Sequence, residues 1–336
     1  MKYLLADKLT EVKFSSIDDL PIIEQDNSFF VVDNNITRLY PDLCCKLQDQ
    51  FQYPAIEENK SLSYAEKLLT WLRSSGANRE SNLIAIGGGI TSDITAWVAA
   101  NYMRGCNLII IPTTLVAMID AALGGKTALN FAGSKNLIGT FYPASQVVID
   151  INFLNTLSED QMLAGKAEMI KTALLQRGDL LKIAGSDQIY DMIKSAVKFK
   201  MEICARDPYD NNVRRSLNLG HTYAHVIESA LNYKINHGRA VAIGIAAAAE
   251  LSLILNKIDS SRYQEIMELM TQNFSDAYLT LNKQEYEIIR NTGEEYFKND
   301  KKAGKASRVV LFDNEKITDI VEGLSWFDLL KTIKTY

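Results

Sequence analysis

Cysteine and histidine are scarce in this chain of 336 residues, which contains four cysteines and three histidines. The cysteines include no CxxC pair, so the sequence excludes a zinc ribbon. Two of them are adjacent, and an ordinary disulfide between neighbours would be strained. The sequence therefore favours reduced thiols that are partly buried. The four are Cys44, Cys45, Cys106 and Cys204.

A long apolar run and a basic charge balance are also absent. No apolar stretch reaches bilayer-spanning length without a charge or a glycine, and the N-terminal run MKYLLADKLTEVKF shows no signal-peptide pattern. The formal net charge is −5, whereas a generic nucleic-acid binder would be basic. We therefore expect a cytoplasmic protein whose partners include neither a membrane nor a nucleic acid.

The first half of the chain alternates two hydrophobic patterns. Unbroken apolar runs predict strands, and apolar residues at helical spacing predict helices between them. The expected strands lie within 29–35, 82–89, 107–114 and 146–154, and the expected helices within 63–77 and 90–105. This β-α-β order predicts a parallel sheet that is covered by helices.

The second half is mostly helical. Ser158 is a candidate N-cap with Gln161 in a capping-box position, and helical spacing dominates through residues 238–257. Residues 307–321 resemble a short hairpin that follows a lysine-rich loop. Because the length exceeds what one compact core usually holds, we expect two domains, at 1–155 and 156–336.

The three histidines all fall within seventeen consecutive positions, at His221, His225 and His237. The first two are four residues apart, which places them on one face of a helix. Imidazole suits zinc, and a catalytic zinc typically has three protein ligands, often including a carboxylate. The clustering favours a metal site over three unrelated histidines. Spacing alone leaves open which histidines bind the metal and which acid joins them.

Three glycines at 87–89 follow an expected strand and precede an expected helix. Such a turn lets a phosphate approach the backbone at a helix N-terminus. The pattern is GGGxxxD and not GxGxxG, so a tight turn without a ligand stays equally open.

Basic side chains among glycines suggest anion binding. Lys126, Lys135 and Asn136 lie in the run LGGKTALNFAGSKNLIG, where ammonium groups and exposed amides suit an anionic substrate. Lys301 and Lys302 in NDKKAGK form either a second anion contact or a solvated basic loop.

Taken together, several motifs resemble the 3-dehydroquinate synthase family within the wider sugar-phosphate cyclase superfamily. They are IGGGxxxD, the run from PTTLVAMID through GGKTALN to SKNLIGTFYP, GKAEMIK, RRSLNLGHTYAHVIE, HGxAVAIG and NDKK. The resemblance runs from about Asp33 to the DKK segment. It implies a Rossmann-like, NAD-binding α/β domain at 1–155, a mostly α-helical metal- and substrate-binding domain at 156–336, a site between the two domains, and a homodimer.

The resemblance also assigns roles by position. It implies that Glu168, His221 and His237 bind Zn²⁺ or Co²⁺, and that His225 contacts substrate. The other implied substrate contacts are Asp120, Lys126, Lys135, Asn136, Lys171, Lys200, Arg214, Asn218, Arg104 from the second subunit, and one lysine of the Lys301–Lys302 pair. The implied NAD⁺ contacts are Asp33, Asn35, Glu57, Lys60, Gly88, Gly89, Asp93, Thr113, Thr114, Phe153 and Thr156, together with Lys126 and Lys135.

The implied activity is that of a carbon–oxygen lyase of the shikimate pathway. It converts 3-deoxy-D-arabino-heptulosonate 7-phosphate to 3-dehydroquinate and phosphate by transient oxidation with NAD⁺, elimination, re-reduction and aldol closure. The alternatives are a cyclase that acts on another sugar phosphate, such as a 2-deoxy-scyllo-inosose, 2-epi-5-epi-valiolone or amino-dehydroquinate synthase, a metal-dependent alcohol dehydrogenase, and a non-catalytic binding protein. The chain departs from the usual family pattern at Ser92, Ala121, Ala122, Pro208, Asp210 and Arg239.

Overall fold

The computed structural model describes residues 1–21, 26–299 and 308–336. The chain forms two compact units. The first contains Met1–Met162 and Val197–Asp210, and the second contains Leu163–Ala196 and Asn211–Tyr336. The sequence did not indicate that the segment from Val197 to Asp210 returns to the first unit. The domain limit at residue 155 stays a prediction.

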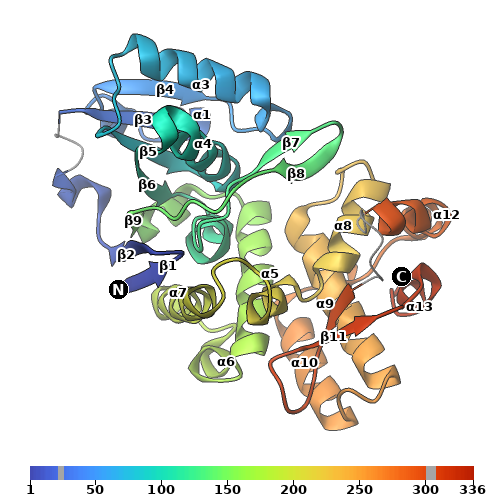
Figure 1. Cartoon of the computed structure of the whole chain (residues 1–336). Helices are drawn as coiled ribbons and strands as arrows, with labels where there is room; N and C mark the ends of the chain where they lie inside the picture. Colours follow the sequence, from blue (N-terminus) through green and yellow to red (C-terminus); the bar gives the residue numbers. More distant parts are fainter. Residues whose placement is uncertain (22–25, 300–307) are drawn as a thin grey trace. The chain divides into compact units, whose positions relative to one another are not determined.

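The first unit is built on a seven-stranded sheet in the order β1-β2-β9-β6-β5-β3-β4 (Figure 1). All neighbouring strands are parallel except β1 and β2. The strands are β1 (Lys2–Leu5), β2 (Lys8–Phe14), β3 (Ser28–Asp33), β4 (Asp49–Tyr53), β5 (Asn82–Gly87), β6 (Asn107–Pro112) and β9 (Gln146–Ile149). A separate antiparallel hairpin contains β7 (Leu129–Phe131) and β8 (Ser134–Ile138).

Helices pack on this sheet through apolar residues at helical spacing. The α-helices of this part are α1 (Asn34–Leu39), α2 (Pro41–Cys44), α3 (Leu62–Ser74) and α4 (Gly89–Asn101). Shorter 3₁₀ or π turns lie at Ile17–Asp19, Glu57–Asn59, Tyr102–Arg104, Ala117–Ala121 and Ile151–Thr156. In α3, Trp71 contacts the rings of Phe29 and Phe51 on two neighbouring strands. Helix α4 packs on β3, β5 and β6, as its buried threonines and alanines allow.

The order of the strands reverses at β3, because the strands that follow it in sequence lie on both of its sides. Strand β4 lies on one side of β3, and β5 and β6 follow on the other. In open α/β sheets, ligands bind beyond the carboxyl ends of the strands at such a switch point. Asp33 ends β3, Gly87 ends β5 and Thr113 follows β6. The sheet therefore brings three segments with predicted cofactor residues to one edge.

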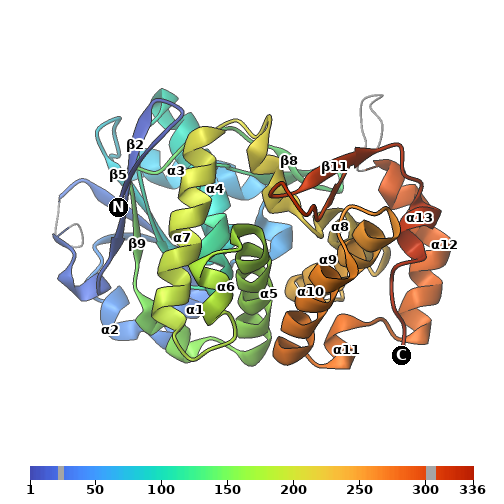
Figure 2. The same ribbon diagram turned by 90° about the horizontal axis from the view of Figure 1, so that it is seen from below.

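The second unit is dominated by helices, with the 18-residue α9 at its core. Helix α9 packs against α8, α10, α11 and β10, and its alanine-rich sequence lets these neighbours approach closely (Figure 2). Its helices are α5 (Glu159–Gln176), α6 (Asp179–Ile183), α8 (His221–Ala230), α9 (His237–Ile254), α10 (Ser260–Asn273), α11 (Asp276–Leu279), α12 (Lys283–Asn299) and α13 (Trp326–Leu330). Helix α7 (Ile189–Arg206) begins in this unit, and its residues from Val197 onward belong to the first. A 3₁₀ turn spans Val213–Asn218, and β10 (Arg308–Leu311) pairs with β11 (Asp319–Glu322) in an antiparallel hairpin.

The predicted fold class is confirmed: a mainly parallel α/β sheet is followed by a mostly helical part. The last apolar run of the first half is shorter than expected, because β9 ends at Ile149 and a 3₁₀ turn follows. Strands β1, β2 and β4 were not predicted. Among the described residues, one helix, His237–Ile254, has the length and hydropathy of a membrane span, and 72% of that window is buried inside the protein.

Candidate functional site

Helix α5 places a carboxylate and an ammonium group one turn apart in the interior of the second unit. Glu168 is 1% exposed and Lys171 is 2% exposed. Their positions differ by three, so both side chains lie on one face of the helix. Glu168 Oε2 lies 2.6 Å from Lys171 Nζ. A buried carboxylate is tolerated here because opposite charge lies beside it.

His221 is the first residue of α8, directly after Gly220. Gly220 has a φ of 77°, and a Cβ there would lie 2.9 Å from the amide nitrogen of Ile245 on α9. Only glycine therefore fits this entry to the helix. The Nδ1 atom of His221 lies 3.2 Å from the carbonyl oxygen of Leu219, and its Nε2 lies 3.4 Å from Glu168 Oε1.

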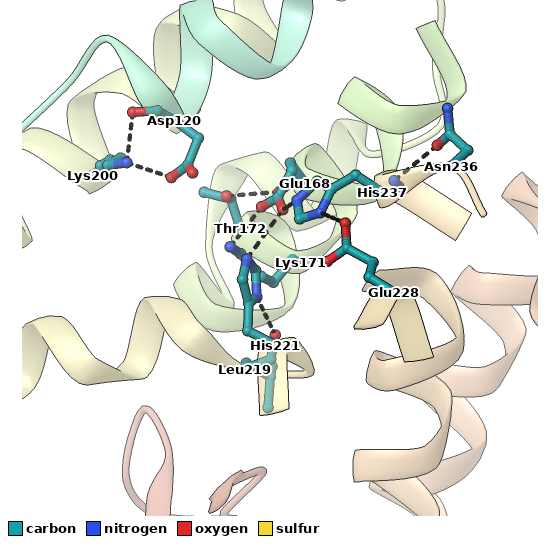
Figure 3. Close-up of polar contacts among 11 residues, drawn as sticks. Asp120, Glu168, Lys171, Thr172, Lys200, Leu219, His221, Glu228, Asn236 and His237 are labelled. Carbon is teal, nitrogen blue, oxygen red and sulfur yellow. Dashed lines mark hydrogen bonds and ion pairs between the residues drawn. The ribbon is translucent and has the colours of Figure 1, made fainter. Parts of the chain in front are cut away.

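His237 is the first residue of α9 and follows the N-cap Asn236, whose side chain accepts a hydrogen bond from the amide of Gly238. The Nδ1 atom of His237 lies 3.3 Å from Glu228 Oε1, and its Nε2 lies 3.4 Å from Glu168 Oε1. Both histidines thus use Nδ1 for a neighbouring oxygen and direct Nε2 toward the same carboxylate (Figure 3). This arrangement selects the nitrogen that is available as a ligand.

The electrostatics of the cluster centre on Glu168. Burial alone would raise its pKa, but Lys171 and His221 hold the pKa well below its usual value. Burial would lower the pKa of His237, whereas its hydrogen bonds with Glu168 and Glu228 raise that pKa to about 10. The cluster therefore keeps Glu168 ionised among basic groups. A divalent cation could supply the same positive charge beside this carboxylate.

The residues present fit a metal ion. The three ligand atoms of Glu168, His221 and His237 lie within 4.8 Å of one another. Two imidazole nitrogens and one carboxylate oxygen form a known donor set of catalytic zinc sites, which keep a further position open for water or substrate. Within 1–21, 26–299 and 308–336, it is the one group of three or more His, Cys, Asp or Glu side chains with this spacing.

Other candidates lie in the same unit. The His225 ring is 5.7 Å from that of His221 at an interplanar angle of 90°, and its side chain is exposed. Arg214 is buried and Asn218 is half-buried, and both belong to the 3₁₀ turn before α8.

Glu228 contributes to the metal cluster but was not identified from the sequence. It is 6% exposed and lies seven residues after His221 on α8. The same helical periodicity that relates His221 to His225 also places Glu228 two turns from His221, so a signal existed. Which histidine Glu228 contacts could not be inferred, because its contact with His237 comes from the packing of α8 against α9.

In the first unit, the predicted NAD⁺ residues gather at the carboxyl ends of the strands. Asp33 is buried, which raises its pKa, and it accepts a 2.9 Å hydrogen bond from the amide of Asn35. Lys60 is buried and donates to Asp93 Oδ2 at 2.7 Å. A Cβ on Gly88 would contact the Thr114 side chain at 3.2 Å. This glycine therefore keeps the space beside the helix N-terminus open.

The remaining predicted NAD⁺ residues lie in several separate contacts of the first unit. Glu57 Oε1 accepts a 2.7 Å hydrogen bond from Asn130, and Lys135 lies 4.0 Å from Glu57 Oε2. The ring of Phe153 contacts that of Tyr40, whose hydroxyl lies 2.9 Å from Thr156 Oγ1. The other members are half-buried Gly89, which opens α4, and buried Thr113, whose amide donates to the Gly87 carbonyl at 3.0 Å.

The predicted substrate contacts of the first unit include two lysines that are already paired. Lys200 donates to the carboxylate of Asp120 and, at 2.6 Å, to its backbone carbonyl. Lys126 Nζ lies 2.5 Å from Asp210 Oδ2. Asn136 and Arg104 are exposed and have φ values of 55° and 66°. Lys301 and Lys302 lie outside the described residues.

Comparison with known proteins identifies the family. The model for the 3-dehydroquinate synthase N-terminal part matches residues 50–164, and that for the C-terminal part matches residues 165–303. The chain belongs to the 3-dehydroquinate synthase family. It is 40% identical over 262 residues to a 3-dehydroquinate synthase of Natranaerobius thermophilus, covering 71% of each chain. It is 39% identical over 274 residues to that of Pyrococcus abyssi, covering 77% of this chain and 82% of the relative.

A solved structure of 2-deoxy-scyllo-inosose synthase, in complex with carbaglucose-6-phosphate, NAD⁺ and Co²⁺, has the same fold. It matches with a TM-score of 0.84 at 24% identity and covers 99% of both chains. The family that the motifs suggested is thus confirmed, and with it an enzyme family whose members act on sugar phosphates.

Proposed function

We propose that this protein is a 3-dehydroquinate synthase, which converts 3-deoxy-D-arabino-heptulosonate 7-phosphate to 3-dehydroquinate and phosphate. One observation carries the proposal: in a member of this family, the half-buried His221 and His237 meet around the buried Glu168, beside Lys171. A chain that had lost the chemistry would have no reason to keep a buried carboxylate among three basic groups, an arrangement that is costly to desolvate.

The metal would be Zn²⁺ or Co²⁺, held by Glu168, His221 and His237. A bound divalent cation would act as a Lewis acid that lowers the pKa of a substrate hydroxyl. The donor set of two nitrogens and one oxygen supports this choice. The crystallised 2-deoxy-scyllo-inosose synthase contains Co²⁺ and NAD⁺, which also supports it.

NAD⁺ would bind at the edge where β3, β5 and β6 end. A bound nicotinamide would accept a hydride from the substrate and return it within one turnover. The glycines at 87–89 and the N-terminus of α4 suit the pyrophosphate, and Asp33 at the end of β3 suits a ribose hydroxyl.

The side chains of the chain itself would bind and orient the substrate. Arg214 offers a planar guanidinium that suits a carboxylate, and Asn218 lies one turn further along the same segment. Lys171 lies close enough to the cluster to stabilise a developing oxyanion. Lys126 and Lys200 would exchange their aspartate partners for substrate oxygens.

The proposal extends to the assembly and the location of the protein. A homodimer would let Arg104 of the partner subunit contribute to phosphate binding. This arginine is exposed in a short turn after α4, where another subunit could reach it. A cytoplasmic location fits the four cysteines, none of which forms a disulfide.

Phosphate release from a panel of sugar phosphates tests the proposal. We expect release from 3-deoxy-D-arabino-heptulosonate 7-phosphate, with 3-dehydroquinate identified by mass, and none from glucose 6-phosphate or sedoheptulose 7-phosphate. The absorbance of NADH should show no net change, because the cofactor is regenerated. Net NADH would identify a dehydrogenase, and release from a substrate without a carboxylate would identify another cyclase.

A variant at Arg214 separates substrate choice from the general chemistry. Arg214→Ala should raise KM for the carboxylated substrate by roughly tenfold or more, because a charge-assisted hydrogen bond is lost. The neighbouring Arg215→Ala serves as the matched control and should leave KM unchanged. Equal effects of the two changes would contradict the role of Arg214 in binding the carboxylate.

A further inference from the structure

Arg239 forms a two-pronged ion pair near the start of α9, two residues after His237. Its Nη1 and Nη2 atoms donate to the two carboxylate oxygens of Glu285 at 2.8 and 2.9 Å, and Nη2 also donates to the Thr280 carbonyl at 2.8 Å. The side chains of Arg239 and Glu285 are 19% and 20% exposed. Such a bidentate geometry fixes direction as well as distance.

Electrostatics alone do not explain an arginine at this position. The first turn of a helix has a partial positive charge, so a cation there is unfavourable unless an anion lies beside it. The first turn of α9 contains no acidic residue. The compensating charge comes from Glu285 on another helix, so the ion pair links the first turn of α9 to α12.

Glu285 is itself held rigidly. Its carboxylate accepts a 2.9 Å hydrogen bond from the amide of Asn282, and its own amide donates at 2.9 Å to the Asn282 side chain. This reciprocal pair closes the N-terminus of α12. Burial opposes the charge of Glu285, but the hydrogen bonds from Arg239 and Asn282 hold its pKa below the usual value. Arg239 is therefore bound to a carboxylate whose position is fixed at the N-terminus of α12.

The other side of the same turn is held by close packing. A Cβ on Gly238 would lie 2.1 Å from the Cα of Ala164 on α5, so the two backbones are in direct contact there. Helix α5 also carries Glu168. The turn that contains His237 is thus fixed against α5 through Gly238 and against α12 through Arg239.

We propose that the Arg239–Glu285 pair is a positioning device that fixes His237 for metal binding. The inference rests on the proposed metal site. Without the pair, the first turn of α9 would lose its link to α12, and the imidazole would lose a defined distance to Glu168 and Glu228. Arg239 acts through His237 and does not itself contact the metal.

Titration of the metal-free, full-length protein with Co²⁺ tests the proposal, since visible absorbance reports the ligand geometry and competition with a chelator gives Kd. Arg239→Ala should raise the Kd for Co²⁺ by roughly tenfold and alter the spectrum, as loss of supporting contacts does at other metal sites. Arg239→Lys should restore part of the affinity. Glu285→Gln, a milder change of the partner, should act in the same direction as Arg239→Ala.

Lys257→Ala provides a matched control. Lys257 forms a 2.7 Å ion pair with Asp319 just beyond the other end of α9, about 27 Å along the helix from His237. Because this pair is more exposed and has a single contact, we expect Lys257→Ala to lower the melting temperature less than Arg239→Ala and to leave the Kd and the spectrum unchanged.

Two results would overturn the inference in different ways. If Arg239→Ala lowers the melting temperature but leaves the Co²⁺ Kd and spectrum as in the wild type, the pair is only structural. If the wild type binds no Co²⁺, or binds it equally well after Glu168→Gln, the proposed metal site itself is wrong.

Discussion

The two units of this protein balance charge in opposite ways. In the first unit, Lys135 lies 4.0 Å from Glu57, and three other lysines that are expected to meet anionic ligands are each paired with an aspartate of the same unit. These pairs are Lys60 with Asp93, Lys126 with Asp210 and Lys200 with Asp120. In the second unit, the buried carboxylate of Glu168 lies among Lys171, His221 and His237, and the carboxylate of Glu228 contacts His237 from the other side of its ring.

The difference indicates what each unit is prepared to bind. A lysine that pairs with a carboxylate can instead pair with a phosphate or another anion and so keep an opposite charge beside it. A carboxylate that is surrounded by basic groups can instead bind a metal cation. We therefore expect the first unit to bind anionic ligands and the second to bind a metal, and variants that remove one partner should separate the two arrangements.

The largest effect on metal binding and stability is expected at Glu168, in the metal cluster of the second unit. Glu168→Gln should abolish metal binding and turnover, because the only carboxylate ligand loses its charge. It should also lower the free energy of unfolding by about 3 kcal/mol, because the buried Lys171 keeps its charge without that of Glu168. Metal content by mass spectrometry and denaturant unfolding measure the two effects.

The double variant Glu168→Gln, Lys171→Met is the control for that measurement. Removing both charges should recover most of the lost stability, while metal binding stays absent. If the single variant Glu168→Gln kept full stability and full metal content, Glu168 would not be a metal ligand, and the contrast between the two units would not reflect what they bind.

A pair of glycines provides the next test. Gly238→Ala forces a Cβ to within 2.1 Å of a backbone atom on α5, so it should cost about 1–3 kcal/mol of stability and weaken Co²⁺ binding. Gly89→Ala in the first unit meets only the Cβ of Ala121, at 3.1 Å, and should cost less than about 1 kcal/mol. Equal losses of stability in urea unfolding would refute the claim that the metal cluster depends on close helix packing.

The smallest effect is expected at Asp210. This residue has a φ of 58°, a conformation that asparagine also tolerates, so Asp210→Asn should leave the backbone unchanged. Because Lys126 then loses its carboxylate partner, binding of inorganic phosphate should tighten by up to about fivefold at low salt. Calorimetric titration at two salt concentrations measures this, since the gain should diminish as salt screens the charges.

The surface change Asp179→Asn removes an equal charge from the exposed pair with Lys182 and is the matched control. It should leave phosphate affinity unchanged. Weaker phosphate binding by Asp210→Asn would mean that Asp210 orients Lys126 and does not compete with the ligand.

Much of the fold could be predicted because its strongest signals are local. The unbroken apolar runs of β3, β5 and β6 and the apolar length of α9 need no distant partner to be recognised. Strand β2 could not be identified in this way, since it pairs with β9 more than a hundred residues later. The return of residues 197–210 to the first unit is likewise a property of tertiary packing.

The site shows the same limit. The clustering of three histidines predicted a metal centre, but the spacing left open which of the three bind the metal. In the structure His225 is exposed, and His237 reaches Glu168 because the start of α9 packs directly against α5 at Gly238 and Ala164. The family resemblance separated the two roles, whereas spacing could not. Glu228 was missed because its contact with His237 joins two helices and cannot be inferred from spacing within one helix.

The hydrogen bonds at both Nδ1 atoms have a consequence for how the ion would enter. Zinc fingers order their ligands only as the ion arrives, so the ion must supply the energy of folding. Here Leu219 and Glu228 already hold the two imidazoles, so loading would cost little side-chain entropy. We therefore expect the chain to fold without its metal ion and to bind the ion afterwards.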